Sequence, residues 1–119
     1  MGYSQPSSAL YKFPAATLST AAIIGRIQAP AGKRGRVADI SVVTTTGTTV
    51  AACTIDAGVT GDVASFGTQT VPITAINLGV NGYVPVAGHE IAAGDLIEIS
   101  ANGECTAGAG DVSVLIDWY

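Results

Sequence analysis

The sequence predicts a small all-β domain, a sandwich or small barrel of about seven short strands. Its 119 residues have the length of one domain, and its apolar side chains are mostly small, with 19 Ala and 12 Val against seven aromatic residues. With 15 Gly and 13 Thr added, this composition is typical of strands and tight turns. Segments of alternating polarity recur about every ten residues between turn signals, which is the spacing of a sandwich.

The clearest strands are predicted in the second quarter of the chain and at its end. Residues 36–46 alternate and finish in a Thr run before Gly47, and residues 50–57 follow at hairpin distance. Residues 111–119 alternate throughout. Weaker strands are expected at 21–27, 70–78, 83–86 and 96–101, with a tight turn at Asn81-Gly82.

The last of these strands also identifies core residues. A strand places every second side chain on the same face, and the apolar positions of 111–119 are two residues apart. Trp118, the only tryptophan, is therefore expected in the core, together with Val112, Val114 and Ile116.

Charge is divided unevenly along the chain. All five cations lie within the first 36 residues, which contain no acid, and all nine acids follow, for a net charge of −4. Residues 1–32, in which Pro6 and Pro14 prevent a continuous helix, are predicted to be an extended N-terminal arm, and residues 33–119 a β-sandwich domain. Such asymmetry favours one of two arrangements. Either the basic arm contacts a different partner from the acidic body, or the charges of the arm and the body neutralise each other. The negative net charge argues against nucleic acid as a partner.

The candidate partner-binding residues lie in this basic segment. Two aromatic side chains would serve as apolar anchors, and a basic cluster between turn glycines would meet carboxylates on the partner. Deleting residues 1–20 is expected to weaken this docking and to leave the body folded. The predicted set is Tyr11, Lys12, Phe13, Lys33, Arg34 and Arg36.

No residue pattern predicts a catalytic site, a cofactor or a metal site. His89 is the only histidine, has no local signature of a nucleophile beside it, and is expected in an exposed loop. Cys53, Cys105 and one histidine are too few to close a structural zinc site. Two free thiols are favoured over a disulfide, because the chain starts without a secretion signal and cytosolic thiols stay reduced. No apolar run has the length that a membrane span needs.

Three segments of the body carry a resemblance to a known family. They are GRVADISVVTTT at 35–46, CTIDAGVTGD at 53–62 and AGDLIEISAN at 93–102, followed by a Gly-Ala turn and a strand that ends in Asp-Trp-Tyr. Over residues 33–119 the chain resembles small structural proteins of tailed bacteriophages. The resemblance implies a capsid cement, or decoration, protein: a jelly-roll-like antiparallel β-sandwich of about seven to eight strands, commonly trimeric, that sits where capsomers meet.

Two functions therefore stay open. In the first, the protein is a non-enzymatic cement protein on the virion surface, is made in the host cytoplasm, and binds the major capsid protein as a homo-oligomer, with a trimer as the first expectation. In the second, it is a receptor- or carbohydrate-binding β-sandwich module of a tail fibre or baseplate. Sugar sites commonly display exposed Trp or Tyr side chains, so the predicted burial of Trp118 favours the first function.

Overall fold

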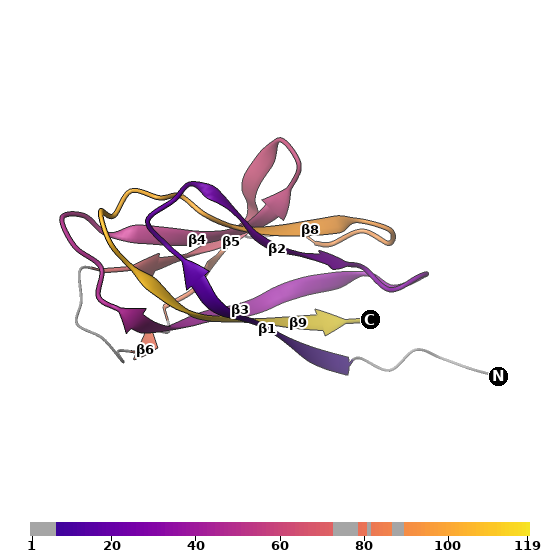
Figure 1. Ribbon diagram of the computed structural model, residues 1–119. Coiled ribbons are helices and arrows are strands. Elements are labelled where there is room, and N and C mark those ends of the chain that lie inside the picture. The colour runs from indigo at the N-terminus through magenta and orange to yellow at the C-terminus, as the bar shows by residue number, and fades with distance from the viewer. Residues whose placement is uncertain (1–6, 73–78, 81, 87–89) are drawn as a thin grey trace.

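The computed structural model describes residues 7–72, 79–80, 82–86 and 90–119. Within these residues, nine strands and no helix form two antiparallel sheets that pack face to face (Figure 1). The predicted all-β sandwich is confirmed. The strands are β1 (Ser7–Thr17), β2 (Ala22–Gln28), β3 (Gly35–Thr46), β4 (Cys53–Val59), β5 (Asp62–Val71), β6 (Gly79–Val80), β7 (Val84–Pro85), β8 (Leu96–Ala101) and β9 (Ala109–Trp118).

The strand order is that of a jelly roll. One sheet has the order β1-β9-β3-β6 and the other the order β2-β8-β4-β5-β7, so β1, β2, β3 and β4 fall alternately in the two sheets. The chain then returns along itself, because β9 pairs with β1 and β8 with β2. Strands near the two ends of the sequence therefore lie side by side, as in the two nested Greek keys of this architecture.

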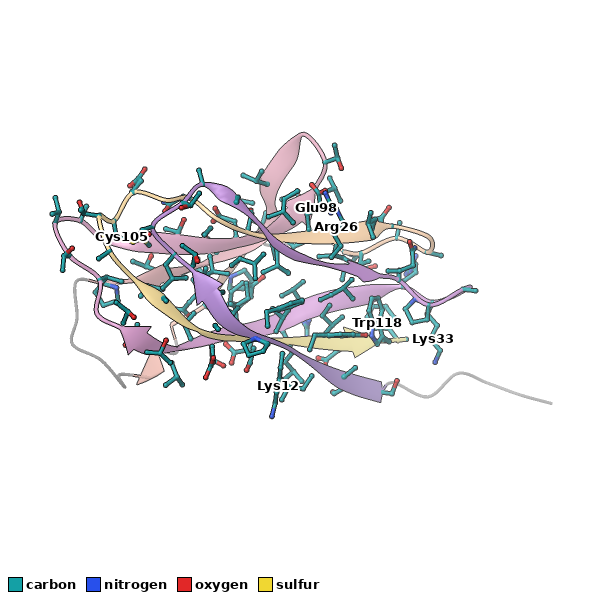
Figure 2. The ribbon with its side chains drawn as sticks, viewed as in Figure 1. Lys12, Arg26, Lys33, Glu98, Cys105 and Trp118 are labelled. Carbon is teal, nitrogen blue, oxygen red and sulfur yellow. A yellow bond between two sulfur atoms is a disulfide. The ribbon has the colours of Figure 1, made fainter. Side chains whose placement is uncertain are left out.

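The core is built from the inward faces of the long strands, and β9 shows the pattern most clearly. Its inward side chains Val112, Val114 and Ile116 are fully buried, and Trp118 is 3% exposed, as the alternation predicted. Trp118, labelled in Figure 2, lies at the end of β9. Its indole Nε1–H donates a hydrogen bond of 3.0 Å to the hydroxyl of Tyr11. The buried Trp118 therefore has a partner for its one polar group.

Residues 7–28 do not form the separate arm that the sequence indicated. They form β1 and β2, one edge strand of each sheet, and the connection between them places Leu18 in the core with no exposed surface. The division into an arm at 1–32 and a body at 33–119 is therefore wrong for the described residues. Deleting residues 1–20 would remove β1 and Leu18 and would uncover β9, so the body is not expected to stay folded after that deletion.

Proline did not prevent a strand in this segment, for a local reason. Pro14 lies at a bulge, where the register of β1 against β9 shifts between Phe13 and Ala16. Ala15 takes a positive φ of 54°, and its N–H donates to the carboxylate of Asp111 at 2.9 Å. A proline is tolerated at an edge or a bulge because no ladder hydrogen bond is lost there.

The middle of the chain also differs from the prediction. β5 spans Asp62–Val71, whereas a strand was expected at 70–78, of which residues 73–78 lie outside the described residues. Gly67 interrupts the alternation of β5, and the ring of Tyr83 occupies the space that a side chain at Gly67 would need. Asn81 of the predicted turn and His89 also lie outside the described residues.

Tyr83 links the β6–β7 connection to β5 and should give the fold a measurable pH dependence. Its hydroxyl donates to the carbonyl of Phe66 at 2.9 Å, and burial, with a smaller effect of Asp39, raises the pKa of Tyr83 to about 12. The ordinary value is about 10, so the folded state holds this proton more tightly than the unfolded state does. The stabilisation is complete below pH 10 and is lost as the pH rises towards 12.

We expect this loss to be about 1 kcal/mol, because the side chain is only partly buried. Urea denaturation of the wild type at about pH 9.5 and about pH 11.5 measures it. Tyr83→Phe should show a smaller difference between the two pH values. Equal differences in both proteins would assign the loss to other groups.

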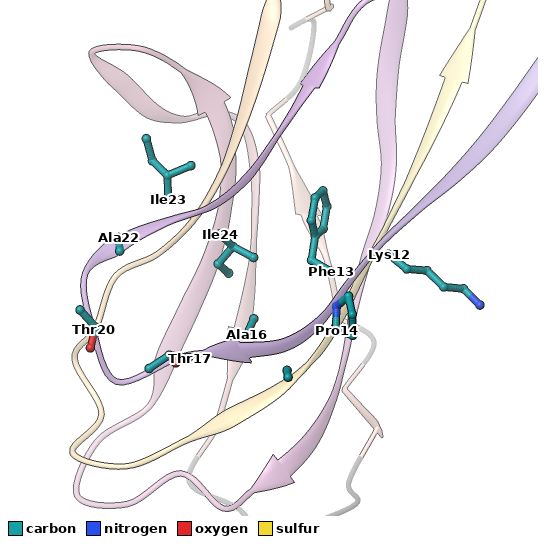
Figure 3. A pocket seen from close by; sticks show the side chains of 10 residues that line it. Lys12, Phe13, Pro14, Ala16, Thr17, Thr20, Ala22, Ile23 and Ile24 are labelled. Atoms are coloured by element: carbon teal, nitrogen blue, oxygen red, sulfur yellow. The ribbon is translucent and has the colours of Figure 1, made fainter.

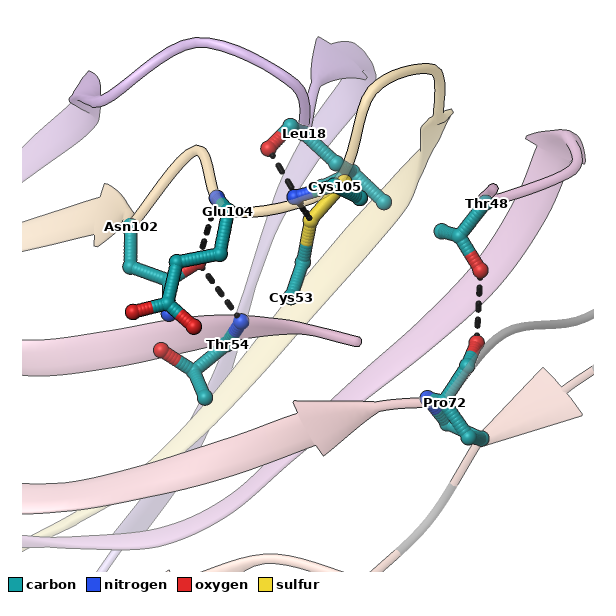
Figure 4. Close-up of a disulfide and its surroundings, with 8 residues drawn as sticks. All are labelled: Leu18, Thr48, Cys53, Thr54, Pro72, Asn102, Glu104 and Cys105. Carbon is teal, nitrogen blue, oxygen red and sulfur yellow. Dashed lines mark hydrogen bonds between the residues drawn. A yellow bond between two sulfur atoms is a disulfide. The ribbon is translucent and has the colours of Figure 1, made fainter. Parts of the chain in front are cut away.

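Cys53 and Cys105 form a disulfide, so the expectation of two free thiols is wrong (Figure 4). The loop between β8 and β9 returns over the start of β4 and brings the two Cα atoms to 5.4 Å. The same loop is held by Asn102, whose side-chain oxygen accepts the N–H groups of Thr54 at 3.0 Å and Glu104 at 3.2 Å. The two cysteines are 52 residues apart in the sequence, so their proximity becomes visible only in the folded chain.

Candidate interaction surface

The structure divides the predicted docking residues between the interior and the surface. Tyr11 and Phe13 are half-buried on β1 and pack against the core. The ring of Phe13 fills the space above Gly25 of β2, where a Cβ would collide with it. Inside the subunit, these two side chains attach the edge strand β1 to the rest of the sandwich.

Lys12 and Arg36 point to the other side of the same sheet. Lys12 of β1 lies beside Ser113 of β9, which in turn lies beside Ser41 of β3. Four residues further along β9, Asp117 lies beside Arg36 of β3. Both basic residues are exposed, and they alternate with side chains that face the core. Two parts of the sequence that are 24 residues apart therefore meet on one face.

We call this surface the outer face; it is the solvent side of the β1-β9-β3-β6 sheet. Between its two basic residues lies the apolar pair Leu10 and Leu115, and Leu10 is 54% exposed. Val43 on β3 is 46% exposed. Small polar side chains and three acids fill most of the remainder. The outer face consists of Ser8, Leu10, Lys12, Arg36, Asp39, Ser41, Val43, Asp111, Ser113, Leu115 and Asp117.

Two of the predicted basic residues already have acidic partners. Arg34 lies 3.5 Å from the carboxylate of Glu90, and Arg36 lies 3.5 Å from that of Asp117. Two residues of the basic cluster are therefore paired with acids of the body, which is the neutralisation that the uneven charge distribution left open. Both pairs are well exposed, so each contributes at most about 1 kcal/mol and can exchange partners at little cost. No ion pair involves Lys12 or Lys33 among the described residues.

A polar hollow of about 460 Å³ adjoins the outer face at the end of β9. Asp117 accepts a hydrogen bond from the hydroxyl of Ser8 at 2.6 Å there. A hydrogen bond with Glu90 is the main cause that raises the pKa of Tyr119 at the chain end. Acidic, basic and hydroxyl groups together line the hollow, so it is suited to polar contacts. Its lining is Ser7, Ser8, Arg36, Glu90, Asp117 and Tyr119.

A second hollow, of about 500 Å³, lies at the open edge of the sandwich between β1 and β2 (Figure 3). It follows the bulge around Pro14 and continues to Ile24, whose side chain lies across β2 from that of Ile23. Lys12 is the only charged side chain among the described residues that line it. The bulge interrupts the regular hydrogen-bonding edge of β1, which protects a long edge strand from pairing with other strands.

The part of the chain that the structure describes contains no group of three or more His, Cys, Asp or Glu side chains that could hold a metal ion. It also contains no helix that is long and apolar enough to cross a membrane.

Comparison with known proteins adds structural neighbours only. No family model and no curated protein matches the sequence. A chain from Bacillus endospore appendages, described as disulfide-linked pili, is 22% identical with a TM-score of 0.47, and the match covers 95% of this chain and 85% of that one. A chain of the cyanophage Pam1 capsid is 16% identical, with a TM-score of 0.45 and coverages of 97% and 83%. The SPBc2 prophage-derived protein YomS is 12% identical, with a TM-score of 0.42 and coverages of 100% and 99%.

Two of these three neighbours are phage or prophage proteins, and all three TM-scores lie below 0.5.

Proposed function

We propose that this protein is a non-enzymatic structural protein of a phage virion, a cement protein that binds the major capsid protein and stabilises the head by bridging capsomers. The resemblance of residues 33–119 to such proteins and the jelly-roll order of the strands support the proposal. Bridging adds buried area across a boundary between capsomers. Because many copies act on one lattice, each needs to contribute only a few kcal/mol.

The observation that carries the proposal is the outer face. It is one side of a regular sheet, and its centre is the apolar pair Leu10 and Leu115. The side chains around this pair include the small hydroxyls of Ser41 and Ser113, which cost little to remove from water. Protein interfaces commonly combine an apolar centre with a polar and charged rim.

The copy number in purified particles tests the function directly. A cement protein occurs at a copy number comparable to that of the major capsid protein, whereas a tail-fibre or baseplate module occurs in few copies. Quantitative mass spectrometry of the virion measures this ratio. A ratio typical of a tail component would exclude the cement function.

A substitution in the outer face should separate docking from folding. Leu10→Asp places a charge at the apolar centre and should weaken binding to particles that lack the protein by about tenfold or more, as loss of a central interface residue does. Leu10 is 54% exposed, so the fold should tolerate the change. Val84→Asp is the matched control, since Val84 is 62% exposed on the other sheet. Co-sedimentation with the particles measures both, and equal binding of the two variants would place the contact elsewhere.

The proposal includes a homo-oligomer, with a trimer as the first expectation. Analytical ultracentrifugation at micromolar concentration tests this part separately from capsid binding. A monomer that still decorates particles at full occupancy would leave the cement function in place and would assign trimer formation to the lattice.

The alternative, a receptor- or carbohydrate-binding module, finds less support. Trp118 is buried, and the other aromatic side chains of the described residues are buried or half-buried, so none forms an exposed platform for a sugar ring. We therefore do not propose it.

A further inference from the structure

We propose that a pocket on the solvent side of the β2-β8-β4-β5-β7 sheet binds an alkylammonium group, and that its natural occupant is a lysine side chain of a partner protein. The pocket has a volume of about 310 Å³ and lies on the sheet opposite to the outer face. It is lined by Ala21, Ala22, Ile23, Asp56, Val63, Ser100, Ala101 and Asn102. The inference does not depend on the proposed cement function.

The anion at the pocket is Asp56. This residue lies on β4 between the inward-facing Ile55 and Ala57, so its carboxylate points away from the core. It is nevertheless only 8% exposed. Burying a carboxylate is costly unless a cation or hydrogen-bond donors compensate it. None of the ion pairs among the described residues involves Asp56.

Two hydroxyl groups hold this carboxylate in position without neutralising it. Thr54 donates to one oxygen at 3.3 Å, and Thr68, opposite on β5, donates to the other. A carboxylate has about four acceptor positions, so two donors leave room for an ammonium group with its three N–H bonds. Of the described residues that line the pocket, Asp56 is also the only charged one, which favours a ligand with a single positive charge.

The walls suit the aliphatic part of a lysine. Ala22 and Ile23 of β2, Val63 of the β4–β5 hairpin and Ala101 of β8 provide apolar surface around the carboxylate. Lysine buries its methylene groups along such surface while its ammonium group reaches a polar partner. An arginine would bring a planar group with five donors, for which one carboxylate already engaged by two hydroxyls is a poor match.

The rim of the pocket favours a protein as the source of the lysine. Ile23 is 42% exposed and Val63 is 54% exposed, and they come from different strands on opposite sides of the pocket. A free diamine would occupy the pocket and leave both side chains in water. A lysine that belongs to a folded protein or a peptide would bring neighbouring residues that cover Ile23 and Val63 as well. Apolar contacts that surround a charge and exclude water from it strengthen binding at protein interfaces.

Nuclear magnetic resonance titration of the ¹⁵N-labelled full chain tests the site. The probes are the tripeptide acetyl-Ala-Lys-Ala-amide, 1,5-diaminopentane, and 1-pentanol as the neutral control. We expect saturable shifts at the amides of Ala22, Val63 and Asn102 with the lysine peptide and none of comparable size with pentanol. Asp56→Asn should weaken peptide binding by about tenfold or more, since the charge-assisted contact is lost. Glu104→Gln, which removes a charge from an exposed loop position, should leave it unchanged.

A second variant keeps the test decisive if Asp56→Asn fails to fold. Val63→Ser removes apolar surface from an exposed wall and should weaken peptide binding about threefold without changing the fold. Unchanged affinity in both Asp56→Asn and Val63→Ser, or equal shifts with pentanol, would overturn the proposal. Diaminopentane that binds as tightly as the peptide would overturn the assignment of a partner protein and make a free polyamine the occupant.

Discussion

Replacing Trp118 by alanine should lower the free energy of unfolding by about 3–5 kcal/mol, which is the usual cost of removing a buried tryptophan. The side chain is 3% exposed at the end of β9, where its ring packs directly on Gly35 of β3. It also donates the 3.0 Å hydrogen bond that engages Tyr11 of β1. Trp118 thus joins the three neighbouring strands of one sheet. A domain of ordinary stability has about 5–15 kcal/mol in total, so the variant should be close to unfolding.

Urea denaturation followed by circular dichroism measures this loss, and two further variants separate its causes. Trp118→Phe retains most of the apolar contact but removes the N–H donor to Tyr11, and should cost about 1–2 kcal/mol. Leu115→Ala, on the opposite side of β9, should cost less than Trp118→Ala because Leu115 is only partly buried. A loss of less than about 1 kcal/mol for Trp118→Ala would contradict the central position of this residue in the core.

The sequence predicted those parts of the fold in which alternation is strongest. β9 has a strict period of two, and β3 alternates on either side of an irregularity between Val37 and Asp39. The positions of both strands agree with the prediction to within two residues. β1 was missed because Pro14 suggests a break, and only its pairing with β9 shows that the proline lies at an edge bulge. β5 was misplaced because Gly67, which makes room for Tyr83, removes the regular pattern. In each case the deciding contact is distant in the sequence.

The same limit applies to the candidate surfaces. The composition of the basic segment indicated which residues to consider, but not that Phe13 packs inward while Lys12 beside it faces solvent. That division follows from the register of β1 against β9. The sequence alone does not distinguish Asp56 from the other eight acids. A carboxylate between two inward-facing residues of a strand is the signal that could have drawn attention to it, because its neighbours Ile55 and Ala57 are both apolar.

Removing the disulfide should destabilise the protein by about 4–5 kcal/mol in the double variant Cys53→Ala/Cys105→Ala. The cross-link joins residues 52 apart, and closing a loop of that length restricts the unfolded chain by about 4 kcal/mol in the loop-entropy model. Both side chains are buried, so alanine at the two positions also loses some packing. Native contacts that remain around the loop should keep the variant folded. They are the backbone hydrogen bonds between Thr49 and Thr106, at 3.0 Å, and between Thr49 and Ala107, at 3.3 Å.

Reduction of the wild type provides the matched comparison, because it opens the cross-link without changing the sequence. Urea denaturation with and without dithiothreitol should give two midpoints for the wild type and a single midpoint for the double variant. If the disulfide acts on the unfolded chain, hydrogen exchange in the centre of β9 should accelerate in proportion to the loss of global stability. Exchange that accelerates only around Thr49 and Thr106 would instead assign the cross-link a local role in holding the end of the sandwich. Identical midpoints for the oxidised and reduced wild type would contradict any stabilising role of the Cys53–Cys105 bond.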